Sequence, residues 1–223
     1  MSEVREFENY LECLVLNPAL YQIKTVEADL RLELNPTHFL NTIFFERNQR
    51  LDFEEFYVAY LDQFMSRLQE FCGEQNRAEF LGGLKARLYR TMVGFLTEYH
   101  AYFLCREFFP RVIRSTKLDM KGVDFQIMED DLIYNIHIYV DTPRANQFRK
   151  LKEEKKGSYS LEGRHINFPY SLRDGKIHSL RFLKNHFGVY SRPYAEYLRQ
   201  EILNGNLRTK TVREISDRGF VYE

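Results

Sequence analysis

The spacing of apolar residues changes once along this 223-residue chain, near residue 118. Before that point, apolar side chains recur at steps of three and four residues, the period of an amphipathic helix. The segments with this pattern are residues 4–14, 52–72 and 77–109. Beyond it, Val123, Phe125 and Ile127 alternate with polar residues, as in a half-buried strand. The chain must bury both kinds of element, so an α/β (mixed α+β) fold is expected.

A β-hairpin is predicted directly after this change. The polar residues 129–131 form its turn, and the second strand covers Leu132–Val140, which is rich in Ile, Tyr and Val. A helix, a short strand and a last helix are then expected at residues 142–156, 164–170 and 191–205. We expect residues 1–110 to form a helical portion that packs, as one compact unit, on a core of hairpin, helix and strand over residues 111–223.

Basic residues are concentrated in the second half, although 32 basic and 32 acidic residues balance overall. Residues 1–110 hold 11 basic and 17 acidic residues, and residues 111–223 hold 21 and 15. Residues 144–184 alone hold 11 basic against 4 acidic residues. Such a surface suits a phosphate backbone, because each neutralised phosphate releases counterions. A solvated, salt-bridged face is the other interpretation of the same charges.

We expect the protein in the cytoplasm. No apolar stretch approaches the roughly 18–20 residues of a membrane span, and the charged start lacks the apolar region of a signal peptide. Cys13, Cys72 and Cys105 are odd in number and far apart, which is typical of free, buried thiols in a reducing compartment.

Two aspartates mark the entrance of the hairpin. Asp119 and Asp124 flank Lys121-Gly122-Val123, and two carboxylates at such a junction could hold one hard cation through oxygen ligands. A metal held in this way could polarise a phosphoryl oxygen and activate a water. Turn formation and helix capping are the alternative roles for these residues.

Three blocks of this sequence resemble the TaqI family of type II restriction endonucleases. They occur in the family's order within residues 20–172, and the last fifty residues show no clear match. The blocks are IKTVE at 23–27 with Asp29 and ELNP at 33–36; Leu84 with ARLYRT at 86–91 and His100; and Leu118-Asp119 with GVD at 122–124 and IHI at 136–138.

The resemblance implies a magnesium-dependent type II site-specific deoxyribonuclease of a restriction–modification system, with a PD-(D/E)XK core. Such an enzyme hydrolyses phosphodiesters of double-stranded DNA at a short palindrome with a metal-activated water, and it acts as a homodimer. The family's catalytic acids fall on Asp119 and Asp124 of this sequence, which would also hold Mg²⁺.

The second strand of the hairpin departs from the family pattern. There the PD-(D/E)XK arrangement has an acid or a substitute, one spacer and a lysine, and the TaqI family has a glutamine, one spacer and two lysines. The corresponding positions here are His137, Tyr139 and Val140. This strand therefore offers no ammonium group to orient an attacking water.

Several interpretations stay open. His137 could act as a metal ligand or base, since its ordinary pKa of about 6.5 permits either role, or Lys150 or Lys152 could reach the site from the following helix. The chain could instead be a catalytically inactive DNA-binding descendant of the same fold. A further alternative is a helical interaction protein whose basic half binds RNA or an acidic partner. The residues expected to bind DNA phosphates are Arg144, Arg149, Lys150, Lys152, Lys155 and Lys156.

Overall fold

The structure is a computed structural model that describes residues 2–26, 30, 32–72, 77–143, 145, 147, 161–172, 179–205, 212–216 and 219–222. The chain divides into two compact units. We call residues 1–5, 97–183 and 188–223 the sheet unit, and residues 6–96 and 184–187 the helical unit. The boundary lies inside one helix, between Leu96 and Thr97, and not at the expected residue 110.

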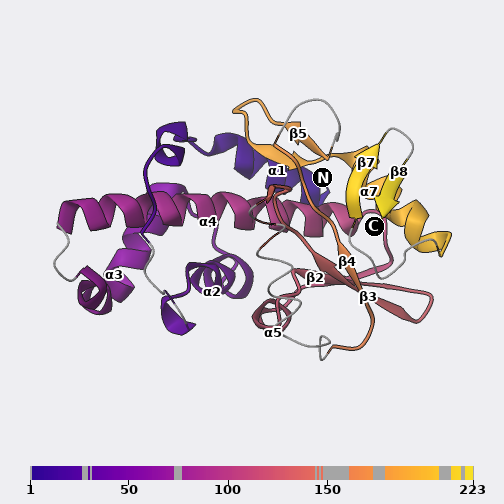
Figure 1. The fold of residues 1–223 in the computed structure, drawn as a ribbon, viewed down its shortest axis with the longest axis horizontal. Helices are drawn as coiled ribbons and strands as arrows, with labels where there is room; N and C mark the ends of the chain where they lie inside the picture. The colour runs from indigo at the N-terminus through magenta and orange to yellow at the C-terminus, as the bar shows by residue number, and fades with distance from the viewer. Residues whose placement is uncertain are drawn as a thin grey trace. The chain divides into compact units, whose positions relative to one another are not determined.

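The helices of the first half form where the apolar period predicts them. The three long ones are α1 (Glu3–Cys13), α3 (Phe53–Cys72) and α4 (Arg77–Cys105), and α4 ends four residues before the predicted residue 109. Figure 1 shows α4 as the longest helix of the chain. The shorter elements between them are η1 (Pro18–Tyr21), η2 (Leu32–Leu34), α2 (Pro36–Leu40) and η3 (Asn41–Glu46).

The apolar stripes of these helices form the core of the helical unit, as the sequence predicts. The ring of Phe39 on α2 lies 5.6 Å from that of Tyr60 and 5.5 Å from that of Phe64, both on α3. The hydroxyl of Tyr60 donates to the carbonyl of Leu34 at 2.5 Å. Because aromatic side chains bury large apolar areas, these contacts stabilise the packing of α2 on α3.

Two of the family-like blocks pack against each other in the helical unit. Arg90 on α4 donates from Nη2 to the carbonyls of Tyr21 at 2.9 Å and Ile23 at 2.8 Å. The backbone of Val26 donates to the carbonyl of Gly83 at 3.4 Å. A side chain at Gly83 would lie 2.9 Å from a methyl carbon of Val26, so the glycine lets the segment approach the helix. These contacts give the two blocks a structural role.

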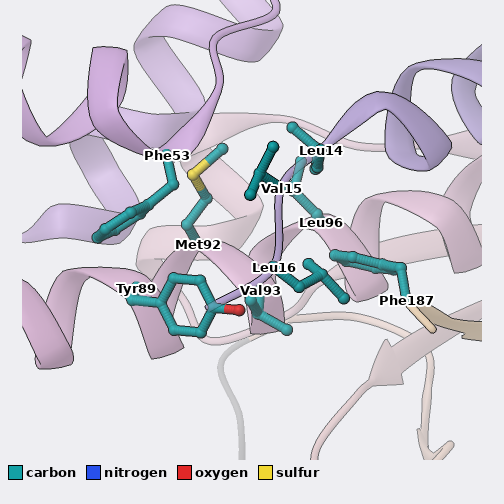
Figure 2. A pocket seen from close by; sticks show the side chains of 9 residues that line it. All are labelled: Leu14, Val15, Leu16, Phe53, Tyr89, Met92, Val93, Leu96 and Phe187. Carbon is teal, nitrogen blue, oxygen red and sulfur yellow. The ribbon is translucent and has the colours of Figure 1, made fainter. Parts of the chain in front are cut away.

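The helical unit also contains a small apolar cavity, shown in Figure 2. Its walls are aliphatic and aromatic side chains, with the Tyr89 hydroxyl at one side. The cavity measures about 10 Å³, no more than the space of one water molecule. It is therefore a packing gap and not a site for a small molecule. The lining residues are Leu14, Val15, Leu16, Phe53, Tyr89, Met92, Val93, Leu96 and Phe187.

The sheet unit is built on a four-stranded sheet in the order β1-β2-β3-β4. Its strands are β1 (Arg111–Ile113), β2 (Phe125–Glu129), β3 (Leu132–His137) and β4 (Arg164–Asn167). β1, β2 and β3 pair antiparallel, whereas β3 and β4 pair parallel. Figure 1 shows β2, β3 and β4 side by side, with the short helix α5 (Thr116–Met120) near the start of β2. The predicted α/β fold class is confirmed.

The predicted hairpin is the β2–β3 pair. Glu129 pairs with Leu132, so the turn is the two residues Asp130 and Asp131, which have φ of 46° and 62°. Positive φ at both central residues is the geometry that matches the twist of a hairpin, and aspartate tolerates it better than most residues. Phe125 on β2 and Ile136 on β3 belong to one buried apolar cluster.

The other elements of the sheet unit cover this cluster or follow it. Helix α7 (Arg192–Leu203) and the last turns of α4 contribute Tyr194 and Tyr102 to the cluster. Two further hairpins pair β5 (Leu180–Phe182) with β6 (Gly188–Tyr190), and β7 (Val212–Ser216) with β8 (Gly219–Tyr222). Cys105 is a buried free thiol, but Cys13 is an exposed one, contrary to the expectation of burial.

The predicted helix after the hairpin also begins as expected. Pro143, Ala145 and Gln147 are helical, and Thr142 accepts a hydrogen bond from the backbone N–H of Ala145 at 3.2 Å through its Oγ1. This is the contact that an N-capping threonine makes.

Candidate active site

The loop between Asp119 and Asp124 is the C-terminal cap of helix α5. Val123 donates to the carbonyl of Leu118 at 3.0 Å, and Gly122 donates to that of Asp119 at 2.7 Å. This pair of bonds is the Schellman motif, which requires a left-handed residue that is usually glycine. Gly122 supplies it with φ of 76°. The five-residue spacing of the two aspartates is thus set by a helix end.

Three further contacts hold this loop to the sheet. Asp124 donates its backbone N–H to the carbonyl of Ile136 at 3.0 Å, and its carboxylate accepts the backbone N–H of Ile138. Buried Arg114 donates from Nη1 to the carbonyl of Asp124 at 3.2 Å. Both Asp119 and Asp124 are partly exposed, so both can be reached from solvent.

Glu98 on α4 is a third acid of this region, and the sequence did not indicate it. Burial raises the pKa of Glu98 well above its ordinary value of 4.5, and the negative charges of Asp124 and Asp119 raise it further. The positive charge of Arg114 opposes them. The guanidinium carbon of Arg114 also lies 5.2 Å from the ring centroid of Tyr99. Glu98 therefore lies within electrostatic reach of Asp124, Asp119 and the buried Arg114.

His137 makes a different set of contacts. Its Nδ1 lies 2.7 Å from the carbonyl oxygen of Gly122, and its Nε2 lies 2.9 Å from Nδ1 of His165 on β4. The side chain is 1% exposed. Ile136 and Ile138 belong to the apolar cluster, so alternation along the strand places His137 on the other face of the sheet. Since both ring nitrogens are hydrogen-bonded, His137 supports the loop by a contact to its backbone.

The second strand of the hairpin was predicted to reach Val140, but β3 ends at His137, and residues 139 and 140 follow it in an irregular extension. Val140 forms an isolated parallel bridge with Tyr170, and Tyr139 accepts the backbone N–H of Tyr170 at 2.9 Å. Arg114 is the buried cation that the structure places beside Asp124. The residues predicted to bind DNA, and with them the candidate lysines Lys150 and Lys152, lie outside the described residues. They are Arg144, Arg149, Lys150, Lys152, Lys155 and Lys156.

The donor set at this loop fits a hard divalent cation. Magnesium takes oxygen ligands, commonly one or two carboxylates, with waters and substrate phosphate in its other positions. Asp119 and Asp124 offer such oxygens, and their negative charges add to the effect of burial in raising the pKa of Glu98. Within the part of the chain that the structure describes, no three histidine, cysteine, aspartate or glutamate side chains form a metal-holding group.

Three residues of this region were missed by sequence reasoning. Glu98 and Arg114 are single charges on a helix and beside a short strand, and no local pattern distinguishes them from other charged residues. His165 could have been found, because it alternates with the apolar residues of a predicted strand and so faces away from the core.

Comparison with known proteins assigns this chain to a class. It is 33% identical to the type II restriction enzyme TthHB8I of Thermus thermophilus and 31% identical to the type II restriction enzyme TaqI of Thermus aquaticus. Each alignment spans 189 residues, 75% of this chain and 67% of the relative. The relatives are thus restriction endonucleases. A model of the TaqI restriction endonuclease matches residues 4–200, and the chain belongs to the TaqI restriction endonuclease family.

No solved structure gives a significant match to this chain. Among the described residues, no helix combines the length and the apolar character that crossing a membrane requires.

Proposed function

We propose that the protein is a magnesium-dependent endonuclease that hydrolyses phosphodiesters of double-stranded DNA at a specific site. The observation that carries the proposal is the capped loop that presents Asp119 and Asp124, both partly exposed, at the entrance of β2. Membership of the TaqI family supports the reaction class, because the relatives are type II restriction enzymes.

Asp124 is the proposed principal ligand of the magnesium ion, and Asp119 supports it. A bound ion would supply positive charge that lowers the pKa of a water and neutralises the scissile phosphate. The backbone N–H of Ile138 orients the carboxylate of Asp124, and Arg114 holds the backbone of the same residue. Arg114 also supplies positive charge near Asp124, where the family's lysine positions are Tyr139 and Val140. The same charge acts to lower the pKa of Glu98.

His137 has a positioning role in this proposal. Use as a metal ligand or base would require one of its ring nitrogens to give up a hydrogen bond of 2.7 or 2.9 Å inside a buried environment. A buried group left without its partner costs about 1–3 kcal/mol. The contact to Gly122 supports a different use of the ring, which is to fix the loop between the two aspartates.

The substrate is proposed to be a short palindrome bound by a homodimer, in which the two-fold axis of the protein matches that of the DNA. Lys117 and Lys121 are exposed on either side of Asp119 and are available for phosphate contacts. The basic residues that follow Thr142 in the sequence would add further contacts. Cytoplasmic action in a restriction–modification system follows from the same proposal.

Cleavage of plasmid DNA tests the function. Wild type with MgCl₂ or MnCl₂ should give discrete fragments, and Asp124→Asn should cut at least about a hundredfold more slowly, because it removes the charge and keeps an acceptor for Ile138. Asp131→Asn, at the exposed hairpin turn, is the control and should cut like wild type. If Asp124→Asn cuts the plasmid as fast as wild type does, the assigned site is refuted.

A catalytically inactive DNA-binding protein is the second candidate, and the residues Tyr139 and Val140 at the family's lysine positions favour it. Intact plasmid together with salt-sensitive, palindrome-selective binding by wild type would identify this alternative. Weak binding without any palindrome preference would instead indicate a partner such as RNA or an acidic protein.

A further inference from the structure

A chain of polar side chains connects strand β4 to the loop between Asp119 and Asp124. His165 on β4 contacts His137, and His137 contacts the carbonyl of Gly122. We propose that His165 is a positioning residue that acts through His137 to fix this loop. The inference rests on the proposed function in one respect, since it takes the loop to be the metal-binding part of the site.

The hydrogen-bond partners determine where the protons lie. The carbonyl of Gly122 can accept but not donate, so Nδ1 of His137 carries a proton. At the other end, the amide nitrogen of Asn135 lies 3.4 Å from Nε2 of His165, and an amide nitrogen donates. Nδ1 of His165 must then carry the proton that Nε2 of His137 accepts. Both rings are neutral and protonated on Nδ1.

The orientation of the Asn135 amide is itself fixed. Its nitrogen donates to the carbonyl of Glu162 at 3.1 Å, and its oxygen accepts from Nε2 of Gln126 at 2.7 Å. Gln126 pairs with Asn135, and Asn135 pairs with His165, in the register of the sheet. A row across three strands therefore sets the direction of every bond up to Gly122.

This row of hydrogen bonds ends at Gly122, the residue on which the conformation of the loop depends most. Gly122 is the left-handed residue of the Schellman motif that separates the two aspartates. His137, 1% exposed, is surrounded by protein and has little freedom to rotate. Loss of the His165 donor would leave Nε2 of His137 without the 2.9 Å bond and would weaken the hold of the ring on the Gly122 carbonyl.

Two substitutions of equal size separate this role from simple packing. His165→Asn places an amide donor near the position of Nδ1, whereas His165→Leu has the same shape and no donor. We expect Mn²⁺ to bind His165→Leu at least about tenfold more weakly than wild type, as loss of an outer-shell partner usually does, and to bind His165→Asn nearly normally. Calorimetric titration of the full-length protein with MnCl₂ measures this, and urea unfolding checks that both variants fold.

Nuclear magnetic resonance of the ¹⁵N-labelled protein tests the hydrogen bonds of His137 and His165 without any metal or DNA. At about pH 8, where an ordinary histidine is neutral, His137 and His165 should both show the Nδ1–H tautomer. The amide of Asp124 should exchange with solvent faster in His165→Leu than in His165→Asn. The inference would be overturned if His137 and His165 of wild type showed the Nε2–H tautomer. It would also be overturned if His165→Leu and His165→Asn had equal exchange of the Asp124 amide and equal Mn²⁺ affinity. A wild type that binds no Mn²⁺ but shows these tautomers and this exchange difference would refute the proposed function and support the positioning role.

Discussion

Glu98 of helix α4 lies close enough to Asp124, the residue before β2, for the charge of Asp124 to add to burial in raising the pKa of Glu98. A folded-state pKa above the ordinary 4.5 means that the folded protein binds this proton more tightly than the unfolded chain. Stability from this residue is therefore fully present below about pH 4.5 and is lost as the pH rises toward the folded value. Glu98→Gln should raise the free energy of unfolding at about pH 8 and change it little near pH 4.

Urea unfolding at the two pH values measures this effect. Glu79→Gln, in the exposed first turn of the same helix, is the control for the removal of a carboxylate from α4. Added MgCl₂ should stabilise wild type more than Glu98→Gln, because the cation relieves the repulsion of a charged Glu98. A Glu98→Gln protein that loses stability at about pH 8 would contradict the assignment.

Gly122→Ala should destabilise the protein by about 1–2 kcal/mol, since a left-handed conformation costs an ordinary residue roughly that amount. Gly122→Asn should cost less, because asparagine tolerates this conformation. Denaturant midpoints give the comparison, and Mn²⁺ titration should show weaker binding by the alanine variant. Equal stability of alanine and glycine at this position would show that the loop does not depend on the Schellman motif.

Adjacent glycines of α4 should respond in opposite directions to alanine. A Cβ at Gly83 would lie 2.9 Å from Val26 and 3.0 Å from the carbonyl of Lys24, so Gly83→Ala should cost about 1–3 kcal/mol. No atom lies within 4 Å of a Cβ at Gly82, so Gly82→Ala should stabilise the helix by up to about 1 kcal/mol. Thermal or urea unfolding of the pair measures both. A stabilising Gly83→Ala would rule out close packing of the 24–26 segment on this helix.

Arg114→Leu should destabilise the protein by about 1–3 kcal/mol, because it leaves the carbonyl of Asp124 without its donor. It also removes the positive charge that opposes Asp124 at Glu98, so the pKa of Glu98 should rise further. The loss should consequently be smaller near pH 4 than at about pH 8. Arg114→Lys keeps the charge and should fall between wild type and the leucine variant in urea unfolding.

The sequence predicted the elements whose apolar period is long and regular. The stripe of α3 and the alternation around Phe125 each depend on burial of one face, which is visible in the order of residues alone. Strand β1 and helix α5 were not predicted, since elements of three and five residues show too little of a period. The end of α4 at Cys105 also required the structure, because apolar residues continue to Phe109 in the loop beyond it.

The candidate site was predictable only where its residues are neighbours in sequence. Asp119 and Asp124 share a helix end, so their spacing and Gly122 point to one local structure. Glu98 and Arg114 come to Asp124 through the packing of α4 and β1, which no local pattern encodes. The position of His137 was predicted, but its contact with His165 was not, because parallel strand pairing brings His165 to it.

The two ends of the β2–β3 hairpin differ in charge. At the turn, Asp130 and Asp131 are exposed and follow Glu129, whereas the opposite end has exposed Lys117 and Lys121 beside the candidate metal ligands. A polyanion is repelled by the first end, whereas at the second end the two lysines balance the charges of Asp119 and Asp124. Under the proposed function, a DNA duplex would approach Asp124 from the α5 side, with the hairpin turn directed away from its phosphates.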